Sequence, residues 1–95
     1  MSRHIKPLIA AIVSKLTDQE LASLGRIVKE YISATSEFGP FKSAHEGYAI
    51  ILEELDELFD EIRKKDEERN LSNIEMEATQ VAAMGFRFLV DICSK

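Results

Sequence analysis

The stretch EGYAIILEELDELFDEI, residues 46–62, places large apolar residues three or four positions apart and contains no proline. Residues at this spacing lie on the same side of an α-helix, so the stretch predicts a helix with one apolar side. That side comprises Tyr48, Ile51, Leu52, Leu55, Leu58, Phe59 and Ile62, and the opposite side carries Glu46, Glu53, Glu57, Asp60 and Lys64. Glu54 and Glu61 fall at the boundary between the two sides.

Three short sequences predict where helices begin. TDQE (17–20), SAHE (43–46) and SNIE (72–75) each fit the S/T-x-x-E capping box, which satisfies two free amides at a helix start. No alternation of apolar and polar residues indicates a strand. We expect one all-α domain over residues 1–95, a four-helix antiparallel bundle with short loops. Its helices are predicted at about 4–16, 18–36, 43–66 and 72–93.

The fourth predicted helix is apolar around most of its circumference. Its segment VAAMGFRFLVDIC, residues 81–93, is interrupted only by Arg87 and Asp91. Such a helix is buried on most sides, either in a bundle core or in an oligomer interface. Glu77, Gln80, Arg87 and Asp91 nevertheless fall on one side of it, and buried polar groups need partners.

Composition limits the classes of function. The 95 residues are 45% hydrophobic and 31% charged with a net charge of −5, typical of a soluble globular domain. Residues 53–68 hold nine acids and three bases, so a nucleic-acid partner is not expected. The single cysteine, Cys93, excludes an internal disulfide and is typical of a reducing cytoplasm. No apolar run approaches the roughly 18 residues of a membrane span, so no membrane partner is expected either.

Carboxylates on the third and fourth helices would converge if these helices pack antiparallel. Glu53, Glu54 and Glu57 would then approach Glu77, with Gln80 one turn later. Converging carboxylates either share protons or surround a cation, and oxygen ligands favour Mg²⁺ or Mn²⁺. The alternative is that the glutamates of the third helix form an ordinary solvated surface.

EELDE (53–57), nineteen further residues and then EATQ (77–80) resemble the EExxE…ExxD signature of a known family. This is the family of MazG-like, all-α nucleoside triphosphate pyrophosphohydrolases. FGPFKSAHEGYAIILEELDELFDEI and EATQVAAMGFRFLVDIC are also similar to the short members found in phages and mobile elements. The resemblance covers about residues 24–93 and leaves the first helix outside.

The resemblance implies a Mg²⁺-dependent hydrolase, with Mn²⁺ as a possible substitute. Such an enzyme cleaves a nucleoside triphosphate between the α and β phosphates, releasing monophosphate and pyrophosphate, and clears surplus or non-standard nucleotides. Glu54, Glu57 and Glu77 match metal-binding positions, and Glu53 matches a glutamate that could orient or deprotonate the attacking water. Gln80 stands where the family has aspartate. Family members form homodimers or homotetramers.

Several alternatives stay open at this level. Gln80 can ligate a metal through its carbonyl oxygen but adds no charge. The number of metal ions bound, their affinity and the activity itself are therefore open. Arg87 and Lys64 could contact phosphate; equally, Arg87 could pair with Asp91, and Lys64 could be a surface lysine near a helix end. The alternative functions are a catalytically silent helical interaction module and a nucleotide-binding sensor.

Overall fold

The structure is a computed structural model that describes residues 4–94 of the chain. Its α-helices are α1 (Ile5–Val13), α2 (Asp18–Phe38), α3 (Ala44–Ile62) and α4 (Leu71–Phe88). A 3-10 turn at Asp66–Glu68 precedes α4, and a π-helical turn at Leu89–Cys93 continues it. No strand occurs within residues 4–94, so the predicted all-α class is confirmed.

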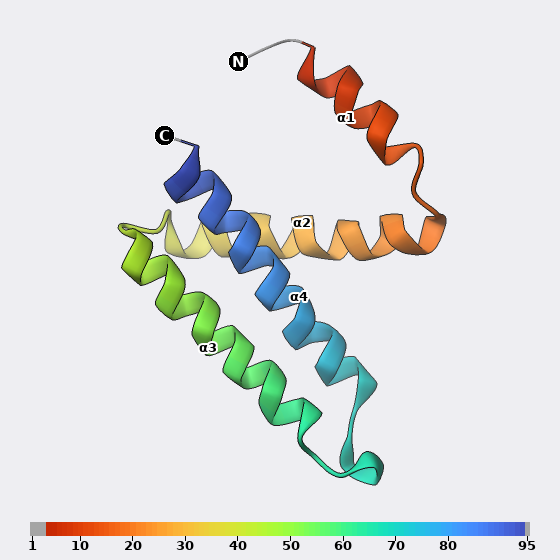
Figure 1. The fold of residues 1–95 in the computed structure, drawn as a ribbon, viewed down its shortest axis with the longest axis vertical. Coiled ribbons are helices and arrows are strands. Elements are labelled where there is room, and N and C mark those ends of the chain that lie inside the picture. Colours follow the sequence, from red (N-terminus) through yellow and green to blue (C-terminus); the bar gives the residue numbers. More distant parts are fainter. Residues whose placement is uncertain (1–3, 95) are drawn as a thin grey trace.

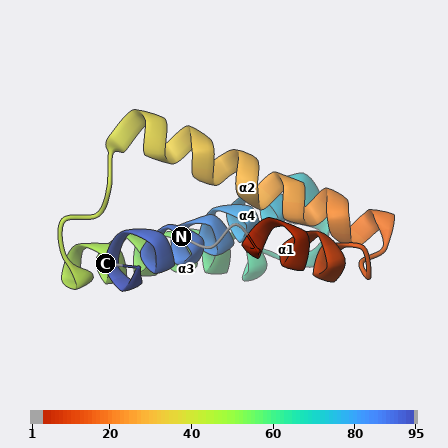
Figure 2. The same cartoon turned by 90° about the horizontal axis from the view of Figure 1, so that it is seen from above.

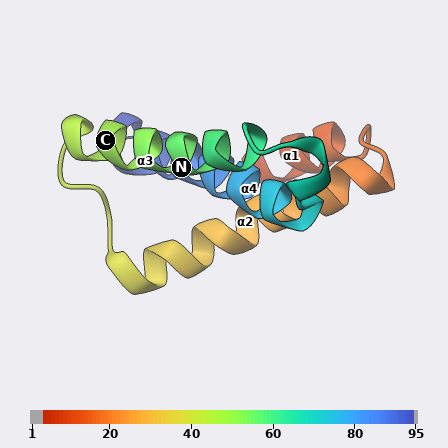
Figure 3. The ribbon, with the colours of Figure 1, turned by 90° about the horizontal axis from the view of Figure 1, so that it is seen from below.

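The helices form a layer of two with a third crossing it. Figure 1 shows α3 and α4 side by side and antiparallel, with α2 running across α4 at a steep angle. Figures 2 and 3 show α2 on one face of this layer, near the layer at its N-terminal end and lifted away toward its C-terminal end. The remaining helix, α1, has no buried residue. None of the helices described is both long and apolar enough to cross a membrane.

The predicted capping box is complete at one of the three helix starts and half-formed at a second. Thr17 and Glu20 form the complete reciprocal capping box of α2. Ser43 accepts a hydrogen bond from the Glu46 amide, but the Glu46 carboxylate accepts from the Lys42 amide, one residue before the cap. The predicted box at residues 72–75 is wrong.

The fourth helix begins at Leu71 because Asn70, two residues before Ser72, caps it. The Asn70 side chain accepts a hydrogen bond from the Asn73 amide at 3.2 Å, so Ser72 lies inside the first turn. The third helix also ends earlier than predicted, at Ile62. The Ile62 carbonyl accepts a hydrogen bond from the Arg69 side chain at 2.8 Å. This bond takes the place of the backbone amide that would bind the carbonyl if the helix continued.

The buried core is small and has α4 at its centre. It consists of Ala34 from α2, Phe41 from the loop after it, and Ala83 and Met84 from α4. Ile27, Ile50, Ile51, Phe88 and Ile92 pack against this core and are partly buried. Ala83, Met84, Arg87 and Asp91 are buried, whereas Phe86, Leu89 and Val90 are exposed, so the predicted burial of segment 81–93 on most sides is confirmed only in part.

Only part of the apolar side of α3 faces the core: Ile51 packs against the core, but most of this side does not. Glu54, Leu58 and Glu61 are partly buried, whereas Leu55 and Phe59 beside them are 48% and 59% exposed. A helix with one apolar side ordinarily turns that side inward. Here α3 turns the boundary of its apolar side toward α4 instead, and this rotation brings its glutamates to the α3–α4 contact.

Candidate metal centre

Three glutamates from the two antiparallel helices meet at one point. One carboxylate oxygen from each of Glu54, Glu57 and Glu77 lies within 4.8 Å of the other two. Glu54 and Glu57 are adjacent on α3 because residues three apart lie on the same side of a helix. Glu77 reaches them from α4 because the two helices run side by side (Figure 1). The predicted convergence of these carboxylates is thus present in the structure.

The environment of this cluster disfavours three negative charges. Burial, followed by a hydrogen bond with Glu57 and the charges of Glu57, Glu77 and Glu53, raises the pKa of Glu54 from 4.5 to about 7. Burial, followed by the charges of Glu57 and Glu61, also raises the pKa of Glu77. Carboxylates forced together in this way either retain a proton or bind a cation.

The donor set fits a hard divalent cation. The Glu54 Oε2 atom is buried and has no hydrogen-bond partner among the described residues. A buried carboxylate oxygen without a donor is unfavourable unless a proton or a cation neutralises the group. Mg²⁺ and Mn²⁺ prefer oxygen ligands, and Mg²⁺ keeps several waters when one or two carboxylates bind it. The three glutamate oxygens could hold such an ion.

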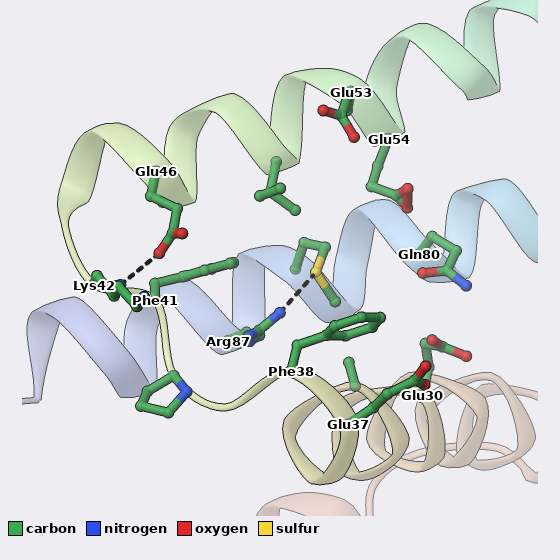
Figure 4. Close-up of a pocket in the computed structure, with 14 residues that line it drawn as sticks. Glu30, Glu37, Phe38, Phe41, Lys42, Glu46, Glu53, Glu54, Gln80 and Arg87 are labelled. Carbon is green, nitrogen blue, oxygen red and sulfur yellow. Dashed lines mark hydrogen bonds between the residues drawn. The ribbon is translucent and has the colours of Figure 1, made fainter.

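Glu54 also lies at the edge of a pocket of about 620 Å³ between the three packed helices. In Figure 4, Glu53 and Glu54 extend from α3 on one side, and Glu30 and Glu37 lie along α2 on the other. Gln80 and Arg87 of α4 lie between these two sides. The pocket occupies the region where α2 lifts away from the layer, so α2 and the 39–42 loop form its outer wall.

The pocket wall is predominantly acidic. The lining acids are Glu30, Glu37, Glu46, Glu53 and Glu54, and the lining cations are Lys42 and Arg87. Phe38 adds an aromatic surface that is 71% exposed. A polyphosphate entering this pocket would meet net negative charge, so its binding there requires a cation.

Arg87 has a structural role that the sequence left open. Its guanidinium donates to the Gly39 carbonyl and lies 3.5 Å from the Asp91 carboxylate, with both side chains 6% exposed. It also lies over the ring of Phe41, 4.2 Å from the centroid, and Asp91 accepts a hydrogen bond from the Phe41 amide. The two residues hold the 39–42 loop against α4. Of the two alternatives that the sequence left open for Arg87, pairing with Asp91 is present, and Arg87 also lines the pocket.

The remaining predicted site residues separate into two groups. Glu53 is exposed and Gln80 partly buried, and both line the pocket. Lys64 instead donates to Glu61 at 3.0 Å and does not line the pocket. Gln80 thus lines the same pocket as Glu53 and Glu54.

Sequence reasoning did not select the residues that α2 contributes to the pocket. Glu30 and Glu37 lie seven residues apart, two turns along one side of α2, with Ala34 between them. This spacing was visible, but an acid on an amphipathic helix is ordinarily solvated, so nothing in the sequence distinguished these two.

Comparison with known proteins adds no assignment. The chain matches no protein-family model, no curated protein and no solved structure. The resemblance to MazG-like enzymes thus remains a prediction.

Proposed function

We propose that the protein is a Mg²⁺-dependent nucleotide pyrophosphohydrolase that cleaves a nucleoside triphosphate to monophosphate and pyrophosphate. The observation that carries this proposal is the convergence of Glu54, Glu57 and Glu77 next to a pocket large enough for a nucleotide. Three carboxylates, one of them with a buried oxygen that lacks a partner, form a site for a divalent cation. A cation there would neutralise phosphate charge and lower the pKa of a bound water.

The chain's own residues supply the rest of the reaction. Glu53 borders the pocket beside the cluster, where its exposed carboxylate can accept a proton from the attacking water. That water forms a new phosphorus–oxygen bond, the bond to the leaving phosphate oxygen breaks, and pyrophosphate departs. Lys42 lies at the opposite end of the pocket, and Phe38 offers its ring to a base.

Gln80 supports a second candidate function, a nucleotide sensor that binds without turnover. Gln80 lines the pocket at the position where the resemblance expects an aspartate. Its side chain is neutral and therefore adds no negative charge for binding a cation. A neutral amide at this position leaves three carboxylates for cation binding. If hydrolysis requires a second cation, the chain binds nucleotide and metal and releases no product.

Pyrophosphate release from a panel of ribo- and deoxyribonucleoside triphosphates tests the proposal, with Mg²⁺, Mn²⁺ or chelator. We expect metal-dependent release from at least one substrate and its loss in Glu57→Gln. Asp56→Asn is the matched control, because Asp56 is an exposed neighbour outside the cluster. Metal-dependent nucleotide binding without release under any condition would favour the sensor. The absence of both binding and release would leave the silent interaction module.

A further inference from the structure

Two acidic side chains on α2 line the pocket without a partner. Glu30 and Glu37 form no hydrogen bond or ion pair with any residue that the structure describes. They lie on the wall opposite Glu53 and Glu54 (Figure 4). A free carboxylate accepts hydrogen bonds at both oxygens, and it binds most strongly to a ligand that presents two adjacent N–H donors. The wall formed by α2 therefore suits a ligand with N–H groups along one edge.

Phe38 adds a flat apolar surface next to Glu37. Its ring lies in the space between α2 and α4 in Figure 4, and the residue is 71% exposed. A large aromatic side chain ordinarily packs against other apolar groups, so an exposed ring in a pocket is available to a ligand. Aromatic rings stack on any nucleobase, because every base has a π-face. Phe38 can thus hold a base, and the choice of base must come from polar neighbours.

Lys42 is the cation of the pocket that remains available. Arg87 already donates to the Gly39 carbonyl and pairs with Asp91. The Lys42 side chain is exposed, and its ammonium group forms no hydrogen bond or ion pair within the described chain. An ammonium group can donate to a carbonyl oxygen of a base. The pocket thus offers a free donor group besides its free carboxylates.

Guanine is the base whose edge matches these groups. Its ring N–H and its 2-amino group are adjacent donors, and its 6-oxygen is an acceptor beside them. Adenine and cytosine place a ring-nitrogen acceptor next to their amino group, so a carboxylate accepts one bond from them and is repelled by the acceptor. Uracil and thymine place a carbonyl oxygen on each side of their ring N–H. Of the common bases, only guanine offers a carboxylate two donors side by side.

We propose that Glu37, Phe38 and Lys42 select guanine nucleotides as the substrate class of this site. Phe38 stacks on the base, Glu37 accepts hydrogen bonds from the ring N–H and the 2-amino group, and Lys42 donates to the 6-oxygen. Glu37 is assigned this role ahead of Glu30 because it adjoins Phe38 in the sequence. The inference rests on the proposed function, since it directs the phosphates to Glu54 on the opposite wall of the same pocket.

The first test compares GTP with ITP, which lacks only the 2-amino group. We expect kcat/KM for Mg²⁺-dependent pyrophosphate release to be about 10- to 100-fold higher for GTP, because a hydrogen bond to a charged group contributes that much to discrimination. ATP, CTP and UTP should also be poorer substrates than GTP. Hydrolysis with equal kcat/KM for GTP and ITP, or with a preference for another base, overturns guanine selection and leaves the hydrolase standing.

Glu37→Gln tests whether the selectivity belongs to one side chain. The amide has one acceptor oxygen and turns its own donors toward those of guanine, so we expect the GTP-to-ITP ratio to fall to within about threefold of unity. Glu30→Gln is the matched control, about two turns away on the same side of α2, and should keep the wild-type ratio. A ratio that Glu37→Gln leaves unchanged, or that both variants lower equally, overturns the proposal.

Binding separates this inference from the proposed hydrolysis. If the wild-type chain releases no pyrophosphate, calorimetric titration with GTP and with ITP in Mg²⁺ measures the base preference without turnover. We expect GTP to bind at least about tenfold more tightly than ITP. This result would contradict the hydrolase and retain guanine selection for the sensor. Equal binding of the two nucleotides, or no binding of either, overturns guanine selection.

Discussion

Protonation of Glu54 affects both the stability of the fold and the charge of the candidate site. Its pKa is raised to about 7 in the folded chain from an ordinary 4.5, so the folded chain holds this proton more tightly. The free energy of unfolding therefore falls as pH rises between these two values, and the loss is complete above the folded pKa. Without a cation, an ionised Glu54 destabilises the fold.

We expect Glu54→Gln to be more stable than the wild-type chain at about pH 8 in chelator, by about 1 kcal/mol, since solvent screens this partly exposed group. At about pH 4 the two proteins should be nearly equal. Urea denaturation at one protein concentration measures both values, with Asp56→Asn as the control. A variant that is less stable than the wild-type chain at the higher pH would contradict this account of Glu54.

Arg87 and Asp91 provide a contrast, because their charges are buried and paired. Removing one partner leaves the other charge buried without compensation, so we expect Asp91→Ala to lower the free energy of unfolding by about 3 kcal/mol. The exposed Asp60–Arg63 pair is the control, and Asp60→Ala should change stability by less than about 0.5 kcal/mol. Denaturant titration of both variants measures the difference. Equal effects would show that the 39–42 loop does not depend on Asp91.

At the scale of the helix, Gly47 of α3 lies against the ring of Phe88 at the end of α4. A Cβ atom at this position would lie 2.6 Å from Cδ2 of Phe88 and 3.0 Å from Cδ2 of Phe41. We expect Gly47→Ala to destabilise the fold by about 1–3 kcal/mol despite the higher helix propensity of alanine.

Gly25→Ala is the matched control for this prediction. Gly25 also lies within a helix, but a Cβ there would have no neighbour within 4 Å. Propensity alone should then raise the free energy of unfolding by about 0.5–1 kcal/mol. Thermal or urea denaturation of both variants gives the comparison. A stabilised Gly47→Ala would show that the α3–α4 contact is looser than the structure indicates.

The helices could be predicted from the sequence because capping residues and helix breaks act over only a few residues. The Thr17 box and the break at Gly39–Pro40 act within a few residues, and both appear in the structure. The early end of α3 could not be predicted, because the Arg69 side chain that holds Ile62 comes from beyond the helix. The sequence predicted Ser72 as the cap of the fourth helix, whereas Asn70 caps it, because both residue types cap helices and they lie two positions apart.

The rotation of α3 about its own axis was the other feature that the sequence could not determine. Its pattern defines an apolar side but not which neighbour covers that side. An apolar stripe predicts burial, yet Leu55 and Phe59 are exposed while Glu54 is partly buried. The convergence of Glu54 and Glu57 with Glu77 was predictable because it needed only an antiparallel α3–α4 pair. The contribution of α2 to the pocket depends on a steep crossing that no local pattern encodes.

At the scale of the whole molecule, cation binding should raise the stability of the folded chain. A ligand at 100 times its dissociation constant adds about 2.7 kcal/mol when it binds only the folded state. We expect Mg²⁺ to raise the melting temperature of the wild-type chain at constant ionic strength, and to have no such effect on Glu57→Gln. Differential scanning fluorimetry with Mg²⁺ against matched NaCl measures this. Equal shifts in both proteins would assign the effect to general charge screening.

The antiparallel pairing of α3 and α4 has a consequence for the order of folding. Glu54 and Glu57 are separated from Glu77 by the segment 63–70, so the three carboxylates meet only as the two helices close on each other. Without a cation, this closure brings like charges together. A cation bound during closure would neutralise this repulsion, so the chain should fold faster with a divalent cation than in chelator.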